Sequence, residues 1–153
     1  MAGEGKEHTV PDSIAYADEH IVKILRETKT IAVVGLDSAP DRWSHRVARY
    51  LLEQGYTIVP VNPMETEVFG LKAYPDLASV PVPIDMVDIF RRNPFIPTHV
   101  DEAIQVGAKV VWMQDELIYI EAAAKAEAAG LTVIMDTCTA RRHRQLRSMG
   151  KLD

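Results

Sequence analysis

Cysteine is almost absent from this chain, and positive charge is not in excess. The 153 residues include one cysteine, Cys138, which excludes an internal disulfide and a zinc site built on cysteines. Lysine and arginine total 17 against 22 aspartate and glutamate residues, so the formal net charge is −5. Surfaces that bind nucleic acids are basic because they meet phosphate backbones, and we therefore expect no nucleic-acid partner.

Long apolar runs are also lacking. No run approaches the ~20 residues that a membrane-spanning helix needs, and the amino-terminal sequence MAGEGKEHTVPDS has no apolar core typical of a signal peptide. We expect a cytoplasmic protein with no membrane partner. Residues 1–12 are expected to form a flexible tail, and residues 13–153 a single domain large enough to bury its own core.

Several catalytic and nucleotide-binding motifs are missing. The chain contains no G-x-G-x-x-G, no G-x-x-x-x-G-K-[ST], no G-x-S-x-G and no H-E-x-x-H. Closely spaced acidic pairs are Glu65 and Glu67, Asp85 and Asp88, and Asp115 and Glu116. We interpret these pairs as turn and surface charges rather than acid–base dyads, although Asp85 or Asp88 is placed to bond a neighbouring backbone amide.

Apolar segments alternate with amphipathic ones along the chain. We expect strands over residues 30–35, 56–61, 85–90, 109–113 and 131–135, with a short edge strand within 69–74. Helices are expected over 14–28 with a cap at Asp12 or Ser13, from a cap at Ser44 to Gly55, over 97–106, 117–129 and 139–148, with a helical turn at 75–78. This alternation predicts an α/β fold: a Rossmann-like, doubly wound parallel sheet in three layers, with strand order 3-2-1-4-5-6.

The first strand–helix junction has the chemistry of a phosphate site. Ligands of open parallel sheets lie beyond the carboxyl ends of the strands, and the predicted order brings residues 35–38 beside residues 90–92. Gly35 lets the backbone turn tightly and approach a ligand closely. A helix that begins near Ser44 offers free amides to a phosphate, and Arg42 adds a cation. The alternative is that Gly35 serves only a tight turn and Arg42 is solvated.

A second candidate cluster follows the strand expected at 85–90. Phe90, Arg91 and Arg92 suit a nucleotide with several phosphates, unless the arginines pair with surface carboxylates. The second strand ends in Asn62, where an NAD-binding chain would carry an acidic residue for the ribose. The pattern therefore indicates a nucleotide-bearing ligand other than NAD.

Several segments together resemble the stand-alone CoA-binding domain family, which is similar to the CoA-binding domain of the succinyl-CoA synthetase alpha subunit. They are IAVVGLDSAPDRWSHRVARYLLEQGYTIVPVNP, VFGLKAYPDL, DMVDIFRRNP, AKVVWMQ and EAAAKAEAAGLTVIMDTC. The resemblance implies a Rossmann-like domain that holds coenzyme A, without the ligase reaction. The contacts it implies are Gly35, Leu36, Asp37, Ser38, Arg42, Ser44, Asn62, Pro63, Phe90, Arg91, Arg92, Met113 and Gln114.

The chain departs from the family pattern at three places. Trp43 stands where proline is common, Asp115 and Glu116 add negative charge near the cleft, and Thr137 replaces an arginine. Cys138 follows the last strand and is interpreted as a buried, inert thiol or, alternatively, as a thiol that meets the thiol of the ligand. We expect its pKa to lie close to that of a free thiol, about 8.5.

Three functions stay open from the sequence. The first is binding of coenzyme A or an acyl-CoA without catalysis by the protein itself, the role that the resemblance implies. The second is an NAD(P)-dependent oxidoreductase on the same fold. The third is an interaction module with a vestigial cleft, in which the basic residues of the last helix bind a protein; a homodimer and an unidentified protein partner both stay open. The basic residues are Arg141, Arg142, His143, Arg144 and Arg147.

Overall fold

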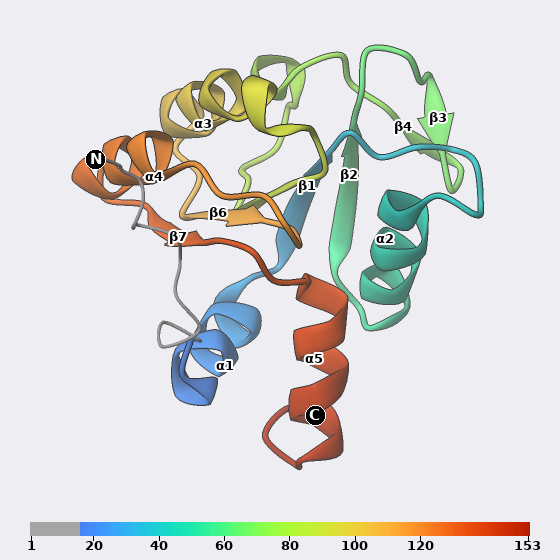
Figure 1. Ribbon diagram of the computed structural model, residues 1–153. Coiled ribbons are helices and arrows are strands. Elements are labelled where there is room, and N and C mark those ends of the chain that lie inside the picture. The colour runs from blue at the N-terminus through green and yellow to red at the C-terminus, as the bar shows by residue number, and fades with distance from the viewer. Residues whose placement is uncertain (1–15) are drawn as a thin grey trace.

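A five-stranded parallel sheet forms the centre of the molecule (Figure 1). The computed structural model describes residues 16–153. The strands lie in the order β2-β1-β5-β6-β7. Their bounds are β1 (Thr30–Val34), β2 (Thr57–Val61), β5 (Met86–Ile89), β6 (Val110–Met113) and β7 (Thr132–Ile134). The order confirms the predicted doubly wound, Rossmann-like fold, and the register places Val34 between Val61 and Ile89 at one end of the sheet.

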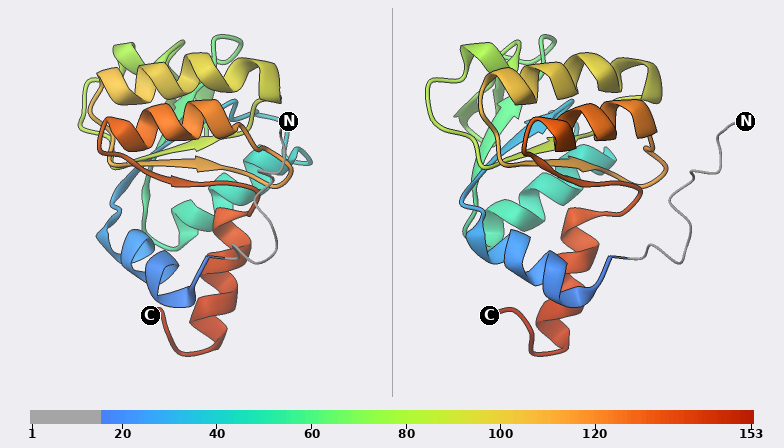
Figure 2. Two further views of the ribbon diagram at one scale, coloured as in Figure 1. Left: turned by 60° about the vertical axis from the view of Figure 1, so that its left-hand side comes forward. Right: turned by 90° about the vertical axis from the view of Figure 1, so that its left-hand side faces the viewer.

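Helices cover both faces of the sheet (Figure 2). One face packs against α1 (Asp18–Glu27), α2 (Trp43–Glu53) and α5 (Thr139–Ser148), and the other against α3 (Ile96–Gln105) and α4 (Ile120–Ala128). Side chains alternate across a strand, so Ile31 and Val33 of β1 enter the first core and Ala32 and Val34 enter the second. Burial on both faces explains why the strands read as continuous apolar runs.

The third strand of the predicted order is reduced to a single bridge. In place of a strand within residues 69–74, β3 (Glu67–Val68) and β4 (Leu71–Lys72) form an antiparallel hairpin. Tyr74 alone then makes a parallel bridge with Val61. Phe69 and Gly70 adopt positive φ angles of 58° and 74° in the hairpin turn. The chain therefore folds back on itself before it reaches the sheet edge. The 3-10 turns η2 (Leu77–Ser79) and η3 (Asn93–Phe95) complete this half of the chain.

Three predicted helix starts are wrong in position, among them that of α4, which begins at Ile120 rather than at residue 117. The expected caps Asp12 and Ser13 and the expected tail of residues 1–12 lie outside the described residues, and α1 begins at Asp18 after Ala17. The cap of α2 is Arg42 rather than Ser44. No helix within residues 16–153 is long and apolar enough to cross a membrane.

Candidate functional site

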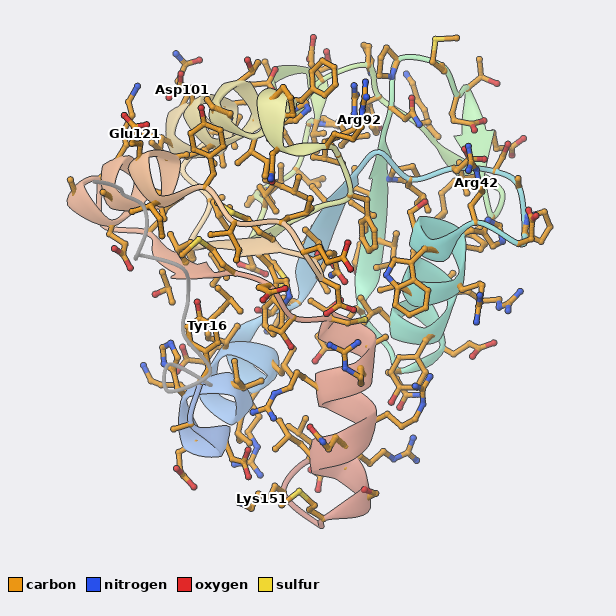
Figure 3. All side chains as sticks on the ribbon, viewed as in Figure 1. Tyr16, Arg42, Arg92, Asp101, Glu121 and Lys151 are labelled. Atoms are coloured by element: carbon orange, nitrogen blue, oxygen red, sulfur yellow. The ribbon has the colours of Figure 1, made fainter. Side chains whose placement is uncertain are left out.

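A cleft of about 520 Å³ lies beyond the carboxyl ends of β1, β5 and β6, against the start of α2. Figure 3 shows Arg42 and Arg92 at this same end of the molecule, far from Lys151 at the opposite end. The residues that line the cleft are Gly35, Asp37, Arg42, Trp43, Ser44, Phe90, Arg91, Arg92, Gln114, Asp115 and Leu117. A hollow of about 590 Å³ also lies along α1 and Lys151, but it is remote from the strand ends where ligands of this architecture bind.

Gly35 brings the exits of β1 and β5 into contact. Its φ is +88°, and a Cβ atom there would lie 2.7 Å from the carbonyl oxygen of Phe90 and 3.0 Å from Cδ of Arg91. A side chain of any size would therefore displace the backbone after β5. This close approach confirms the predicted proximity of residues 35–38 and 90–92.

Hydrogen bonds hold the loop between β1 and α2 in one conformation. The Asp37 amide donates to Ser44 Oγ at 3.0 Å, and the Ala39 amide donates to Asp37 Oδ1 at 2.8 Å. The Ser38 amide donates to Glu65 Oε2 at 2.9 Å. Ser44 therefore supports the loop from the first turn of α2, which explains why it does not act as the helix cap.

Asn62 supports the same loop from behind. Its Nδ2 donates to the Leu36 carbonyl at 3.0 Å, and its Oδ1 accepts from the Met64 amide at 2.9 Å. The amide side chain is thus used within the protein rather than in the cleft. The predicted contacts that do not line the cleft are Leu36, Ser38, Asn62, Pro63 and Met113; Leu36 and Met113 are wholly buried in the cores.

The start of α2 is positively charged. Its cap residue Arg42 makes no side-chain hydrogen bond to the helix, and no acidic residue stands in the first turn. The Arg42 Nε lies 3.5 Å from Asp37 Oδ2, and the Arg42 side chain is 67% exposed. The helix dipole and this exposed guanidinium together favour an anion at this side of the cleft.

Arg91 and Arg92 supply two further cations. Their guanidinium carbons lie 4.4 Å and 5.6 Å from the centre of the Phe95 ring. Neither arginine makes an ion pair with a carboxylate within residues 16–153. The alternative in which they pair with surface carboxylates is therefore not what the described residues show, and both charges remain for an anionic ligand.

Asp115 adds no free negative charge to the cleft. Arg141 of α5 binds both of its carboxylate oxygens, at 2.7 Å and 2.6 Å. This bidentate pair neutralises the acidic residue that departs from the family pattern. The expectation of added negative charge there is therefore wrong for Asp115.

A buried polar triad lies behind the floor of the cleft. Gln114 Nε2 donates to Asp88 Oδ1 at 2.6 Å and to Thr139 Oγ1 at 3.0 Å, and Thr139 Oγ1 donates to Asp88 Oδ2 at 2.9 Å. Asp88 and Thr139 have no exposed surface, and Gln114 is 2% exposed. Burial raises the pKa of Asp88 to about 7, against the two hydrogen bonds that lower it.

The triad corrects the interpretation of one acidic pair. Asp88 is not a surface charge, because β5 places it in the sheet between Val33 and Trp112. Asp85 bonds backbone amides, as expected. Its Oδ2 accepts hydrogen bonds from the Lys29 amide at 3.0 Å and from the Thr30 amide at 2.9 Å. Asp88 is thus a buried titratable group, and Asp85 holds the start of β1 through hydrogen bonds to its backbone.

Comparison with known proteins decides the family. The model of a family described as a CoA binding domain matches residues 29–144. This chain belongs to the CoA-binding domain family. The match confirms the resemblance seen in the sequence, and it spans every residue that lines the cleft.

Relatives of this family member include stand-alone domains and ligase subunits. The chain is 43% identical over 118 residues to an uncharacterized protein, YneT, from Bacillus subtilis, covering 77% of this chain and 87% of that protein. A hypothetical protein from Pyrococcus horikoshii superposes with a TM-score of 0.84 at 41% identity, covering 87% and 94% of the two chains. The alpha subunit of an ADP-forming acetate–CoA ligase from Pyrococcus furiosus is 32% identical over 96 residues, which span 59% of this chain but only 21% of that subunit.

Sequence reasoning missed three features of this CoA-binding family member. Trp43 lines the cleft and is 45% exposed, although its place at the start of a helix was a usable signal. Leu117 also lines the cleft, because α4 begins at Ile120 and leaves Leu117 in the preceding turn. Thr139 gives no local signal, since its partner Asp88 is 51 positions away.

Cys138 lies behind the cleft rather than in it. It is 1% exposed, belongs to the core beneath α1, α2 and α5, and does not line the cleft. Burial raises the pKa of its thiol, so the expectation of a pKa like that of a free thiol is wrong. The geometry agrees with the interpretation of a buried, inert thiol.

Proposed function

We propose that this protein binds coenzyme A or an acyl-CoA in the cleft at the carboxyl ends of β1, β5 and β6. The observation that carries the proposal is the match of the CoA-binding domain family to residues 29–144, the segment that contains the whole cleft lining. Acetate–CoA ligase subunits among the relatives support the same ligand.

Two sets of cationic groups bind different phosphate groups of the ligand. Arg42 and the first amides of α2 bind one part of the phosphate groups, and Arg91 and Arg92 bind another from the exit of β5. Trp43 and Leu117 offer apolar surface for the adenine or the pantetheine arm. Because Gly35 has no side chain, the ligand can approach the backbone where β1 meets β5.

We propose binding without a reaction of the protein's own. The Ser44 hydroxyl in the cleft accepts a hydrogen bond from the Asp37 amide at 3.0 Å. The neighbouring ring nitrogen, Nδ1 of His45, lies 3.0 Å from the Asp37 carbonyl oxygen. Serine and histidine therefore support the loop from two sides, whereas nucleophilic catalysis requires a base bonded to the nucleophile.

The other functions left open by the sequence receive less support. For an NAD(P)-dependent oxidoreductase, Asn62 would have to bind a ribose, but its amide is used by Leu36 and Met64. For an interaction module built on α5, the arginines would have to be available. Arg141 is paired with Asp115, and Arg142 with Asp18 at 3.0 Å.

Isothermal titration of the purified protein with coenzyme A, acetyl-CoA, NAD and ADP tests the proposal. We expect saturable binding of coenzyme A and acetyl-CoA, weaker binding of ADP and none of NAD. Protein unfolded and refolded before titration excludes ligand that copurified. Equal binding of NAD, or no binding of either CoA compound by the refolded protein, would contradict the proposed function.

A further inference from the structure

One buried acceptor in the cleft floor has no partner. Gln114 Oε1 is buried and makes no hydrogen bond to any group within residues 16–153. Buried polar atoms are nearly always paired, because an unpaired one loses its bond to water without replacement. Such an atom next to a ligand cleft indicates that the bound ligand provides the partner.

The orientation of the Gln114 amide follows from its neighbours. Both hydrogens of Nε2 are used, one by Asp88 Oδ1 at 2.6 Å and one by Thr139 Oγ1 at 3.0 Å. The Thr139 hydroxyl gives its own hydrogen to Asp88 Oδ2 at 2.9 Å. If the amide were turned over, Oε1 would take the place of Nε2 and face a carboxylate oxygen, acceptor against acceptor. Above its pKa of about 7 the carboxyl group of Asp88 is ionised, and it then directs Nε2 toward itself and Oε1 away.

Gln114 is also the member of the triad that borders the cleft. It follows Met113 at the carboxyl end of β6 and lines the cleft, whereas Asp88 and Thr139 do not. The two hydrogen-bonded neighbours of the amide do not line the cleft, and the buried Oε1 is the polar atom of the amide that is left without a partner. Both arginines and aspartates line the cleft, and Gln114 is a neutral acceptor among these charged side chains.

We propose that Gln114 Oε1 accepts a hydrogen bond from an N–H group of the bound ligand, and that Asp88 and Thr139 are positioning residues that hold the acceptor in place. This inference rests on the proposed function. Coenzyme A carries such donors in two places, the amides of its pantetheine arm and the amino group of its adenine. Phosphate groups offer no N–H donor, so a bond of this kind comes from the adenine end or from the pantetheine arm.

Two fragments of the ligand distinguish these sources. 3′-Phosphoadenosine 5′-diphosphate carries the adenine without the pantetheine arm, and 4′-phosphopantetheine carries the arm without the adenine. Titration of the wild-type protein and Gln114→Met compares their affinities, since methionine keeps the length of the side chain without an acceptor. We expect the affinity for coenzyme A to fall about tenfold, the affinity for one fragment to fall equally and that for the other to stay unchanged.

A second pair of variants tests the positioning residues and carries the test if Gln114→Met does not fold. Thr139→Val removes one partner of the amide and keeps the volume, whereas Thr139→Ser keeps the hydroxyl. We expect Thr139→Val to weaken binding of coenzyme A and Thr139→Ser to restore it. A purely structural role would lower the stability of both folded variants without this split in affinity.

The outcomes separate a failure of the proposed role of Gln114 from a failure of the proposed coenzyme A binding. Unchanged affinity for coenzyme A in folded Gln114→Met, or an equal loss for both fragments, would overturn the inference while the proposed function stands. Equal affinities of Thr139→Val and the wild-type protein would overturn the positioning role. If the wild-type protein binds no coenzyme A, the proposed function is wrong and the inference fails with it.

Discussion

At the scale of the residue, Gly35 determines how close the ligand can come to the backbone. Any larger residue at this position would be destabilised in two ways. Its φ would have to be +88°, and its Cβ atom would lie only 2.7 Å from the Phe90 carbonyl oxygen. Gly55 has a positive φ of +102° as well, but a Cβ atom there would meet nothing within 4 Å. The two glycines therefore separate backbone strain from steric contact.

Gly35→Ala should destabilise the fold more than Gly55→Ala. Strain alone is expected to cost about 1–3 kcal/mol in each variant, and the contact with the backbone of Phe90 adds to this cost in Gly35→Ala only. Denaturant unfolding measures the difference, and titration of the folded protein should show weaker binding of coenzyme A by Gly35→Ala only. Equal affinities in the two folded variants, even with unequal free energies of unfolding, would show that Gly35 serves only a turn.

The arginine pair gives a second prediction at this scale. Arg91→Ala combined with Arg92→Ala should weaken binding of coenzyme A about tenfold or more, because two cations that face phosphates are lost. Raising the salt concentration should reduce the affinity of the wild-type protein more than that of the double variant. Arg49→Ala is the matched control, since Arg49 is exposed on α2 and does not line the cleft. An unaltered affinity in the double variant would place the phosphates elsewhere.

At the scale of the element, the triad of Asp88, Gln114 and Thr139 joins β5, the end of β6 and the start of α5. These elements are packed largely by apolar side chains, and the triad adds a buried polar contact between them. A carboxylate without surface exposure is costly when ionised, so its proton is retained to higher pH in the folded protein than in the unfolded chain. The same group that orients Gln114 therefore makes stability depend on pH.

The free energy of unfolding should lose the contribution of Asp88 as pH rises. The unfolded chain releases this proton near the ordinary aspartate pKa of 3.8, and the folded protein releases it at a pKa of about 7. The contribution is therefore complete below the lower value and lost as pH rises through the upper one. Unfolding by denaturant at about pH 5 and about pH 8 measures this change.

Asp88→Asn is the control, because asparagine has the same shape and does not titrate. Its stability should gain on that of the wild-type protein between the two pH values. Other titrating groups, such as His143, contribute to both proteins alike, so the difference isolates Asp88. A constant difference between the two proteins would show that the pKa of the carboxyl group is not shifted.

At the scale of the whole molecule, a ligand in this cleft connects most of the sheet. Lining residues follow β1, β5 and β6 and extend into α2. Opening any of these elements breaks the site, so binding is linked to global unfolding. Such a site should stabilise the protein as a unit rather than one loop.

Coenzyme A should therefore raise the melting temperature, and NAD at the same concentration should not. Ligand at about 100 times its dissociation constant adds about 2.7 kcal/mol to the free energy of unfolding. Scanning calorimetry or dye-based melting at several ligand concentrations measures the shift. A melting temperature that does not change in millimolar coenzyme A, in protein freed of copurified ligand, would be incompatible with the proposed site.

Much of the fold was predictable because its causes are local. Continuous apolar runs such as the one ending at Gly35 indicate strands buried on both faces, and the helices between them limit the topology through right-handed crossovers. The junction of residues 35–38 with residues 90–92 follows from that order. The third strand was not predictable in this way, because residues 67–72 pair with each other and leave Tyr74 alone at the edge of the sheet.

The sequence by itself determined the α/β class, the order of the five strands of the sheet, the family resemblance and the end of the sheet where a ligand would bind, since each depends on periodicity or on residues adjacent in the chain. Only the tertiary structure decided that Asp88 is buried, that Asp115 is neutralised by Arg141, and that Gln114 has an unpaired oxygen. The partners in these contacts are 25 to 51 residues apart. Hydrophobic periodicity cannot reveal contacts at such sequence separations, because these side chains meet only when the parallel strands and α5 pack together.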